Sequence, residues 1–487
     1  MSSVSRTKMM KSSRSLKSTW PFKKSVNTRG AVLSALLLGG ILSTAHTHAA
    51  DLLSVVDAAL AQNLSLSSAE TGLDASQYEV DINRAKFLPT LGASANTRWN
   101  ESKTRQEQGG DLANDYNDHG FNITLSQTLF DLGDWYSQRN ANITLDIETL
   151  RTAQTRQRII LDTATTYFEY LKNSAQIRAT QAEYDSSISR LTLINRNIEL
   201  GNVAGTERYE VLAQKEQTAN TLRTLKKEQR VILTELENIV QQAVVPDFDL
   251  QSSVQFSAIS DQRQRSLNDI LYQSGYDLLI AQQTVNQRRQ TLKETGSTFV
   301  PSLKGSIGYT YNDTNESTAT VYPDNGITEE AVYTLTLDIP IVDGGRDYYR
   351  YQQNKVSITQ SEIDLQNSKS RSQQQFDAFI YDINDFSASL QSLTVIIQAN
   401  YASYIGIQKA HKLGTRTITD LLSAESKLFS SIRDYENARY DYIITLVQLN
   451  ELIGNLNKNT IGKIAEQMSP IGDKRADSPI PLHLLTQ

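Results

Sequence analysis

Four segments of the chain alternate apolar and polar residues with a period of two. They are residues 91–99, 121–129, 303–311 and 333–341. Such alternation is typical of β-strands that have one apolar and one polar face. Polar stretches of roughly twenty residues, 100–120 and 312–332, separate the members of each pair. The pattern therefore predicts two β-hairpins that present the same two faces.

Two longer stretches, 134–200 and 346–413, repeat apolar residues at steps of three and four and contain no proline. This period predicts helices that are each on the order of 100 Å long, at ~1.5 Å per residue. Helices of that length need partner helices, as in coiled coils. Each stretch is followed by a glycine, Gly201 or Gly414, which is the residue type that most often terminates a helix. We expect shorter helices over 52–85, 206–241, 266–295 and 419–453.

The two halves of the chain repeat each other at an offset of 212 residues. KFLPTLGASANTRWN at 86–100 aligns with TFVPSLKGSIGYTYN at 298–312, and FNITLSQTLFDLG at 121–133 aligns with YTLTLDIPIVDGG at 333–345. The motif L-G-x-x-x-x-T-[ED] at 200–207 returns at 413–420. Two copies indicate duplication rather than a solenoid. We expect a first repeat over 51–241, a connector (equatorial region) over 242–265, a second repeat over 266–456 and a mobile C-terminal tail over 457–487.

The first 50 residues have the composition of a secretory signal peptide. They carry eight basic residues and no acidic residue, then an apolar run from Ala31 to Leu42 and a short stretch of small residues. That order predicts cleavage after Ala49 or Ala50. The apolar run is too short to span a bilayer as a helix. A basic tail with a membrane anchor is the alternative interpretation.

Composition excludes several classes of function. There is no cysteine, the five histidines are scattered, and no nucleotide-binding or hydrolase motif is present. We therefore expect neither an enzyme nor a cofactor or metal. Removal of the eight basic residues in the signal peptide changes the net charge from −6 to −14. A chain this acidic is a poor ligand for nucleic acid.

The hairpins fit a transmembrane β-barrel better than a soluble sheet. Four strands cannot close a barrel, and open strand edges are not tolerated in lipid, so copies must combine. Three copies give twelve strands, the smallest number here that leaves a lumen. Aromatic residues lie where lipid-interface girdles belong. We place Trp99, Phe121, Tyr309, Tyr311 and Tyr333 at the loop ends of the hairpins and Phe87, Phe130 and Phe299 at the helix ends.

The long helices are too polar for lipid and are expected to form a tunnel in the periplasm. Their turns, at Gly201 and Gly414, make its tip. Glu207 and Asp420 fall in the first turn of the returning helices. An acid at that position favours the helix dipole. In three copies around an axis it also makes an acidic ring, which can select cations and pair with Arg416. A solvated coiled-coil rod is the simpler interpretation of the same helices.

The residues resemble those of the TolC-type outer-membrane channels of efflux pumps and type I secretion systems. The resemblance covers about 51–455 and is carried by KFLPTLG (86–92), LSQTLFD (125–131), ILDTATTYFEYL (160–171), LDIPIVDGGR (337–346), GTRTITDLLSAES (414–426) and NARYDYIITLVQLNELIG (437–454). It implies an α+β membrane protein: a homotrimeric twelve-stranded barrel in the outer-membrane lipid over a long periplasmic α-helical barrel. It also implies a periplasmic adaptor (membrane fusion protein) and an inner-membrane transporter of the RND, ABC or MFS type.

The resemblance also implies a gate at the periplasmic tip. Asp420 matches the first gate aspartate, whereas Ser423 occupies the second aspartate position. Arg416 matches an arginine that links helix pairs, and it would face Thr206 and Glu207. His411 stands where a tyrosine partner is usual, so pH-sensitive closure is a further hypothesis. The expected function is a passive exit duct for drugs or proteins; the alternative is a periplasmic coiled-coil scaffold or adaptor that spans no membrane.

Overall fold

The computed structural model describes residues 49–104, 112–201, 204–251, 253–314 and 326–471 of the 487. All of them belong to one compact unit, Thr47–Gln487. The signal peptide expected over 1–50 lies outside the described residues except for Ala49–Ala50. Those two residues form a short strand, β1, that pairs in parallel with β4, Val245–Pro246.

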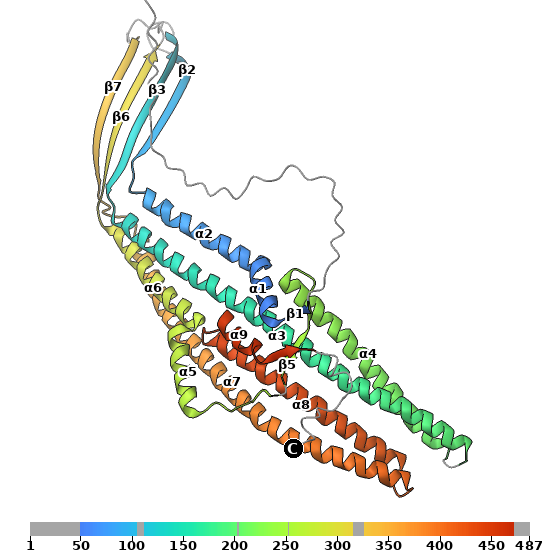
Figure 1. The fold of residues 1–487 in the computed structure, drawn as a ribbon. Helices are drawn as coiled ribbons and strands as arrows, with labels where there is room; N and C mark the ends of the chain where they lie inside the picture. The colour runs from blue at the N-terminus through green and yellow to red at the C-terminus, as the bar shows by residue number, and fades with distance from the viewer. Residues whose placement is uncertain (1–48, 105–111, 202–203, 252, 315–325, 472–487) are drawn as a thin grey trace, which may run out of the picture. The chain divides into compact units, whose positions relative to one another are not determined.

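A four-stranded antiparallel sheet combines both hairpins (Figure 1). Its strand order is β2-β3-β6-β7, with β2 at Thr90–Thr104, β3 at Leu112–Phe130, β6 at Ser302–Thr314 and β7 at Gly326–Asp338. The first hairpin is longer than alternation predicted, because pairing continues through polar residues as far as Thr104↔Leu112. Conversely, β7 stops two residues before Pro340, whose missing N–H cannot join a ladder. The polar loop expected over 100–120 is therefore largely strand.

The register gathers the apolar residues of all four strands on one face. Leu91 is opposite Leu125, which is opposite Ile307, which is opposite Tyr333. Because side chains alternate across a strand, one residue of slippage would move this set to the other face. The face is exposed in the single chain. The sheet therefore carries a row of large apolar side chains that the described residues of its own chain leave exposed.

Long helices extend both halves of the chain beyond the sheet (Figure 1). They are α3, Leu132–Glu199 with 68 residues, and α7, Arg346–Lys412 with 67 residues; both return through shorter helices, α4 at Thr206–Val240 and α8 at Ile418–Leu452. Next to the sheet, α2 (Leu64–Ala85), α3, α6 (Tyr276–Gly296) and α7 pack side by side in that order. Farther from it the order is α4, α3, α8, α7.

Equivalent aspartates start the two long helices. The Asp131 side chain accepts hydrogen bonds from the backbone N–H groups of Gly133 (2.7 Å) and Asp134 (3.2 Å). Asp343, 212 residues later, accepts from the N–H groups of Gly345 and Asp347. Each carboxylate thus satisfies donors that have no partner inside the helix and favours the helix dipole. The sequence repeat therefore includes the aspartates that start the two long helices.

The main hydrophobic core lies where the short elements pack against the long helices. Tyr167 and Phe168 of α3 and Phe376 of α7 are fully buried there. The short elements are α1 (Leu52–Gln62), α5 (Asp261–Ser274), β5 (Phe248–Leu250), α9 (Lys458–Ala465) and β8 (Met468–Pro470). In the part of the chain that the structure describes, no helix contains an apolar stretch long enough to cross a membrane.

The expectation of a mobile tail from 457 is wrong for its first part. Residues 458–465 form α9, whose Ile461 and Ile464 are buried in the core. Strand β8 then pairs antiparallel with β5, so the connector and the tail hold each other. The prolines and mixed charge of this segment suggested mobility, but its first part forms a short amphipathic helix. Residues 472–487 lie outside the described residues.

Candidate functional site

The turn between α7 and α8 is a tight helix-to-helix connection built on Gly414. Its φ of +75° lies in the left-handed region that favours glycine. The N–H of Gly414 donates to the carbonyl of His411 (2.9 Å), and the N–H of Thr415 donates to the carbonyl of Ala410 (3.0 Å). These two bonds are the Schellman pattern, which satisfies the last carbonyls of α7.

Asp420 is held by the start of α8. Its carboxylate accepts from the Thr417 N–H (3.1 Å), while its own N–H donates to the Thr417 hydroxyl (3.1 Å), completing a capping box. The Arg416 guanidinium lies 3.9 Å from the same carboxylate. Hydrogen bonds from Thr417, helped by Arg416, lower the pKa of Asp420 below its usual value. Asp420 therefore keeps its charge to lower pH than a free carboxyl.

His411 closes the same turn. Its Nδ1 lies 3.0 Å from the carbonyl oxygen of Arg416, so the turn brings His411, Arg416 and Asp420 together. Ser423 follows one helical turn after Asp420 and is exposed. The sequence predictions on this turn thus fall within one compact group of residues at the end of a helical hairpin.

The turn between α3 and α4 differs in detail. Gly201 has a φ of +74° and its N–H donates to the carbonyl of Ile198. Residues 202–203 lie outside the described residues. Thr206 and Glu207 occupy the first turn of α4, with Thr206 exposed and Glu207 half-buried. Among the residues on either side of that gap, no contact joins Arg416 to Thr206 or Glu207 within the chain.

Sequence reasoning missed the contacts that join the two tips. The Thr419 hydroxyl donates to the Glu210 carboxylate (2.6 Å), which connects α8 to α4. Beneath that bond a small apolar cluster joins both hairpins; its buried members are Ile194, Val211, Ile418 and Leu421. The residues on the first hairpin are separated from those on the second by more than 200 positions in sequence. No local motif signals their contact, since it depends on how the hairpins align in space.

The structure brings together most of the aromatic residues expected near the outer ends of the strands. Phe121 stacks on Tyr311, with ring centroids 5.3 Å apart, and lies 6.1 Å from Tyr309. Trp99 is exposed. It is opposite Asn117, which lies two residues nearer the loop end of the hairpin than His119. Tyr333 does not join this group, because it pairs with Ile307 midway along the hairpin.

A second aromatic group marks the junction of sheet and helices. Phe130 is opposite Leu303 at a strand bulge, Phe299 follows α6 in a 3₁₀ turn, and Phe87 follows α2. Trp135, which no sequence pattern had indicated, lies near this junction in the first turn of α3. The guanidinium of Arg139 lies 3.6 Å from the centre of its ring, which is a cation–π contact. Such a pair suits a lipid headgroup boundary, where one side is apolar and the other wet.

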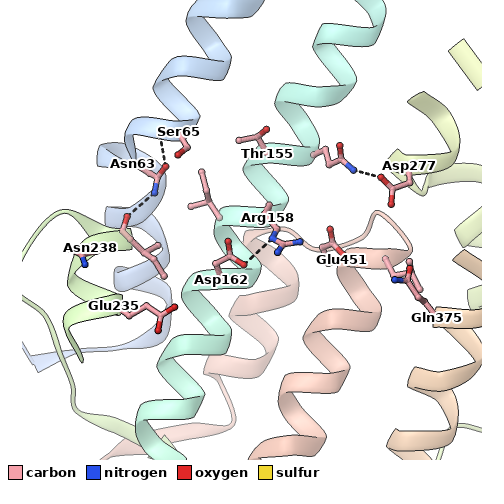
Figure 2. Close-up of a pocket in the computed structure, with 14 residues that line it drawn as sticks. Asn63, Ser65, Thr155, Arg158, Asp162, Glu235, Asn238, Asp277, Gln375 and Glu451 are labelled. Atoms are coloured by element: carbon pink, nitrogen blue, oxygen red, sulfur yellow. Dashed lines mark hydrogen bonds and ion pairs between the residues drawn. The ribbon is translucent and has the colours of Figure 1, made fainter. Parts of the chain in front are cut away.

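An acidic groove lies along α3, and residues of α4, α6 and α8 also line it (Figure 2). It encloses about 680 Å³ and adjoins a second cavity of about 500 Å³. Arg158 and Asp162 pair across one turn of α3 at 3.2 Å, and Gln154 donates to Asp277 (2.6 Å). The carboxylates come from four helices: Asp162 and Glu169 on α3, Glu235 on α4, Asp277 on α6 and Glu451 on α8.

Burial raises the pKa of three of these carboxyls, Asp162, Glu169 and Glu451. Asp277 adds to the effect at Glu451, whereas Arg158 opposes it. Within the described ranges, no group of three or more histidine or acidic side chains is arranged to hold a metal ion. The groove is thus a concentration of negative charge along a helix face.

Comparison with known proteins gives one family. The model of the outer membrane efflux protein family matches residues 55–241 and 267–455, one match in each half. Outer membrane protein TolC of Escherichia coli is 23% identical over 443 residues, covering 88% of this chain and 87% of TolC. Alkaline protease secretion protein AprF of Pseudomonas aeruginosa is 22% identical over 429 residues, covering 84% and 87%.

A solved structure has the same fold. The CmeC outer membrane channel of Campylobacter jejuni superposes with a TM-score of 0.69 at 17% identity, covering 85% of this chain and 89% of CmeC. Long helices, antiparallel strands and two repeated halves are therefore common to both chains. The expected α+β fold class is confirmed at that level.

Proposed function

The chain belongs to the outer membrane efflux protein family, and from this we propose that three copies of it form the gated exit duct of a tripartite export system. It is an outer-membrane channel protein of Gram-negative type and not an enzyme. Beyond family membership, we propose the assembly of three copies, the gate at the tip and the partner proteins.

The observation that carries the trimer is that the chain has two different unpartnered edges. Strand β2 ends the sheet on one side and β7 on the other. Among the described helices, α2 and α4 lie at the first edge and α7 lies at the second. Because the edges differ, copies must join head to tail, which closes into a ring. Three copies supply twelve strands, enough for a lumen.

The internal repeat provides a template for that joint. Within one chain, the first repeat meets the second as β3 against β6, α3 against α6 and α3 against α8. By the 212-residue offset, the equivalent contacts between copies are β7 with β2, α7 with α2 and α7 with α4, where β2, α2 and α4 belong to the next copy. Exposed apolar residues follow a heptad on α7, at Tyr349, Val356 and Ile363. They give this edge the surface that a helix partner needs.

The exposed face of the sheet supports its placement in lipid. Leu91, Leu125, Ile307 and Leu335 lie on it, and apolar patches of this kind mark membrane or protein contacts. In the ring this face points outward, with Ser126, Ser306 and the other intervening polar residues toward the lumen. The aromatic groups at Phe121 and Trp135 then mark the two lipid interfaces.

The gate is assigned to the tip. Three copies of Asp420 around the axis make an acidic ring, and three copies of Glu207 are available for a second one. Ser423 carries no charge, so no acidic ring forms at its position. Arg416 has only part of its surface occupied by Asp420. We assign its remaining contacts to Thr206 and Glu207 of the neighbouring copy. An inner-membrane transporter and a periplasmic adaptor dock at this end and open it.

The names of the relatives bear on cargo. AprF is named for alkaline protease secretion and a second relative, PrtF of Dickeya chrysanthemi, for the secretion of proteases. The cargo is drugs or proteins, and the inner-membrane transporter, of the RND, ABC or MFS type, selects it upstream of the duct.

Planar-bilayer conductance of the purified chain from residue 51 tests the proposal. We expect discrete cation-selective steps whose selectivity weakens in Asp420→Ala and stays unchanged in Ser423→Ala, the matched control one turn away. Arg416→Ala should raise the conductance by loosening closure. Trimers that stay silent in all four chains would reject the duct and favour the periplasmic scaffold. Conductance steps whose cation selectivity is unchanged in Asp420→Ala would place the constriction at another level of the channel.

A further inference from the structure

Between the main core and the apolar cluster near the tip, the seam between α3 and α8 carries a row of polar contacts, unlike the seam between α7 and α8. Its contacts, in order toward the tip, are Lys172–Asp441 (2.8 Å), Gln176–Asn437 (2.6 Å), Glu183–Arg433 (2.8 Å) and Arg190–Glu425. The α7–α8 seam instead buries Leu390, Ile397 and Leu428. The contribution of α3 to that apolar cluster is two alanines, Ala179 and Ala182.

The contact nearest the tip is also the most deeply buried. The Glu425 side chain is 4% exposed and that of Arg190 is 11% exposed. The Glu425 carboxylate accepts hydrogen bonds from both Arg190 and the Ser186 hydroxyl. Tyr404 of α7 lies beside this cluster, where burial and the charge of Glu425 raise the pKa of its hydroxyl. One cluster therefore joins α3 to α8, with α7 beside it.

A second contact supports it one step farther from the tip. The Glu183 carboxylate accepts from Arg433 of α8 and from Gln214 of α4 (3.2 Å). In the proposed ring the equivalent seam lies between α7 and the next copy's α4. At the offset of 213 residues that applies near the tip, Ser403 and Leu212 replace Arg190 and Glu425. The charged cluster thus belongs to one of the two kinds of seam.

We propose that the Arg190–Glu425 pair is a positioning element of the gate, an intramolecular latch that holds α8 against α3 and keeps the tip closed. This rests on the proposed function. In the closed arrangement each buried charge is compensated only by the other, so the pair fixes the position of α8 against α3; in an open arrangement both charges return to water, so closure stays reversible. The apolar α7–α8 seam loses contacts without compensation and stays together. The α7–α8 hairpin therefore moves as one unit against α3.

Removing one partner has a different effect from separating both. Glu425→Ala leaves Arg190 buried without its carboxylate, and its Nε already has no hydrogen-bond partner. A lone buried charge is strongly unfavourable, so the closed arrangement loses stability relative to an open one. Replacing both partners by apolar residues of similar volume removes the charge and keeps the packing. We therefore expect Arg190→Met with Glu425→Leu to restore closure.

Planar-bilayer recordings of the full mature trimer test the latch. We expect Glu425→Ala to raise the open fraction on the order of tenfold or more, and the double variant to return it to the level of the unsubstituted chain. Asp441→Ala is the matched control, since it breaks the pair at the other end of the same seam, where both side chains are more than a quarter exposed. It should leave the open fraction unchanged.

The outcomes separate the latch from the duct. If the unsubstituted chain conducts and folded Glu425→Ala trimers behave identically to it, the latch is rejected and the duct stands. An increase in Asp441→Ala equal to that in Glu425→Ala would also reject it, because any loosening of the seam would then suffice. A double variant as open as Glu425→Ala would reject the pairing. Silence in every chain, Arg416→Ala included, would overturn the duct itself.

Discussion

At the scale of single residues, acids of one chemical type are set to lose their charge at different pH values. Burial raises the pKa of Asp162, Glu169 and Glu451 in the groove, whereas Thr417 lowers the pKa of Asp420 at the tip. As pH falls, the groove is therefore neutralised before the tip. In the proposed channel, a cation-selective ring at Asp420 outlasts the negative charge farther along the α3 face.

The raised pKa of Glu451 makes a stability prediction. The folded chain binds a proton there more tightly than the unfolded chain, so this group's contribution is fully present below about pH 4.5 and is lost as pH rises through the raised pKa. At about pH 8 the ionised carboxylate near Asp277 and Asp162 destabilises the fold. Glu451→Gln should raise the midpoint of thermal unfolding at about pH 8 and leave it unchanged at about pH 4.

Circular dichroism of the helical signal in detergent measures this. Glu228→Gln is the control, because Glu228 is exposed on α4. It should change the midpoint at neither pH. A Glu451→Gln variant that melts lower at about pH 8, or one that shifts equally at both pH values, would contradict the burial argument.

At the scale of elements, local signals in the sequence predicted what local chemistry determines. Gly201 and Gly414 end the long helices as predicted, because each acts within one turn of its own position. Asp131 and Asp343 start these helices through equally local contacts, although the sequence prediction did not include that role. Elements that depend on distant partners were missed. Strand β5 in the connector is fixed by Asp249, which accepts from Tyr440 of α8 (2.5 Å) and pairs with Arg178 of α3.

The candidate site divides in the same way. The turn residues follow one another closely: Asp420 belongs to the repeated motif, and the family resemblance pointed to Arg416 and His411 beside it. The Thr419–Glu210 bond and the Arg190–Glu425 pair join positions more than 200 residues apart. Their contact depends on the relative register of α3, α4 and α8. Periodicity gives which face of a helix is apolar, but not which residue on another helix meets it.

Two glycines of α7 and its turn give a matched test of helix termination. Gly414 has a φ of +75° and open space where the methyl group of an alanine would lie, so Gly414→Ala should cost about 1–2 kcal/mol through backbone strain alone. Gly406 lies inside the helix, also with open space, and Gly406→Ala should stabilise by about 1 kcal/mol. Thermal unfolding of the two variants should shift in opposite directions. Equal shifts would show that Gly414 is not needed for its conformation.

At the scale of the whole molecule, duplication gives one chain two joints of the same kind, one internal and one left open. The internal joint pairs β3 with β6 and packs α3 between α4 and α8. The open joint leaves β2 and β7 without outer partners in the described sheet. A chain that ends on half a joint at each side is completed only by further copies. The duplicated sequence thus supports the ring that we propose.

The open joint predicts where a single added charge should prevent the assembly of copies. Ile363 lies on the exposed apolar heptad of α7, at the open edge, whereas Ile188 is exposed on α3, which has helices on both sides. Ile363→Asp would bury an unpaired carboxylate in the joint between copies, so light scattering after size exclusion in detergent should show monomers. Ile188→Asp, the same change away from that joint, should remain trimeric. If both variants stay trimeric with native helical content, α7 is not the joining edge; if both dissociate, the effect is general destabilisation and the assignment of the joint fails. Monomers from Ile363→Asp alone would place the subunit boundary along α7, where the repeat puts it.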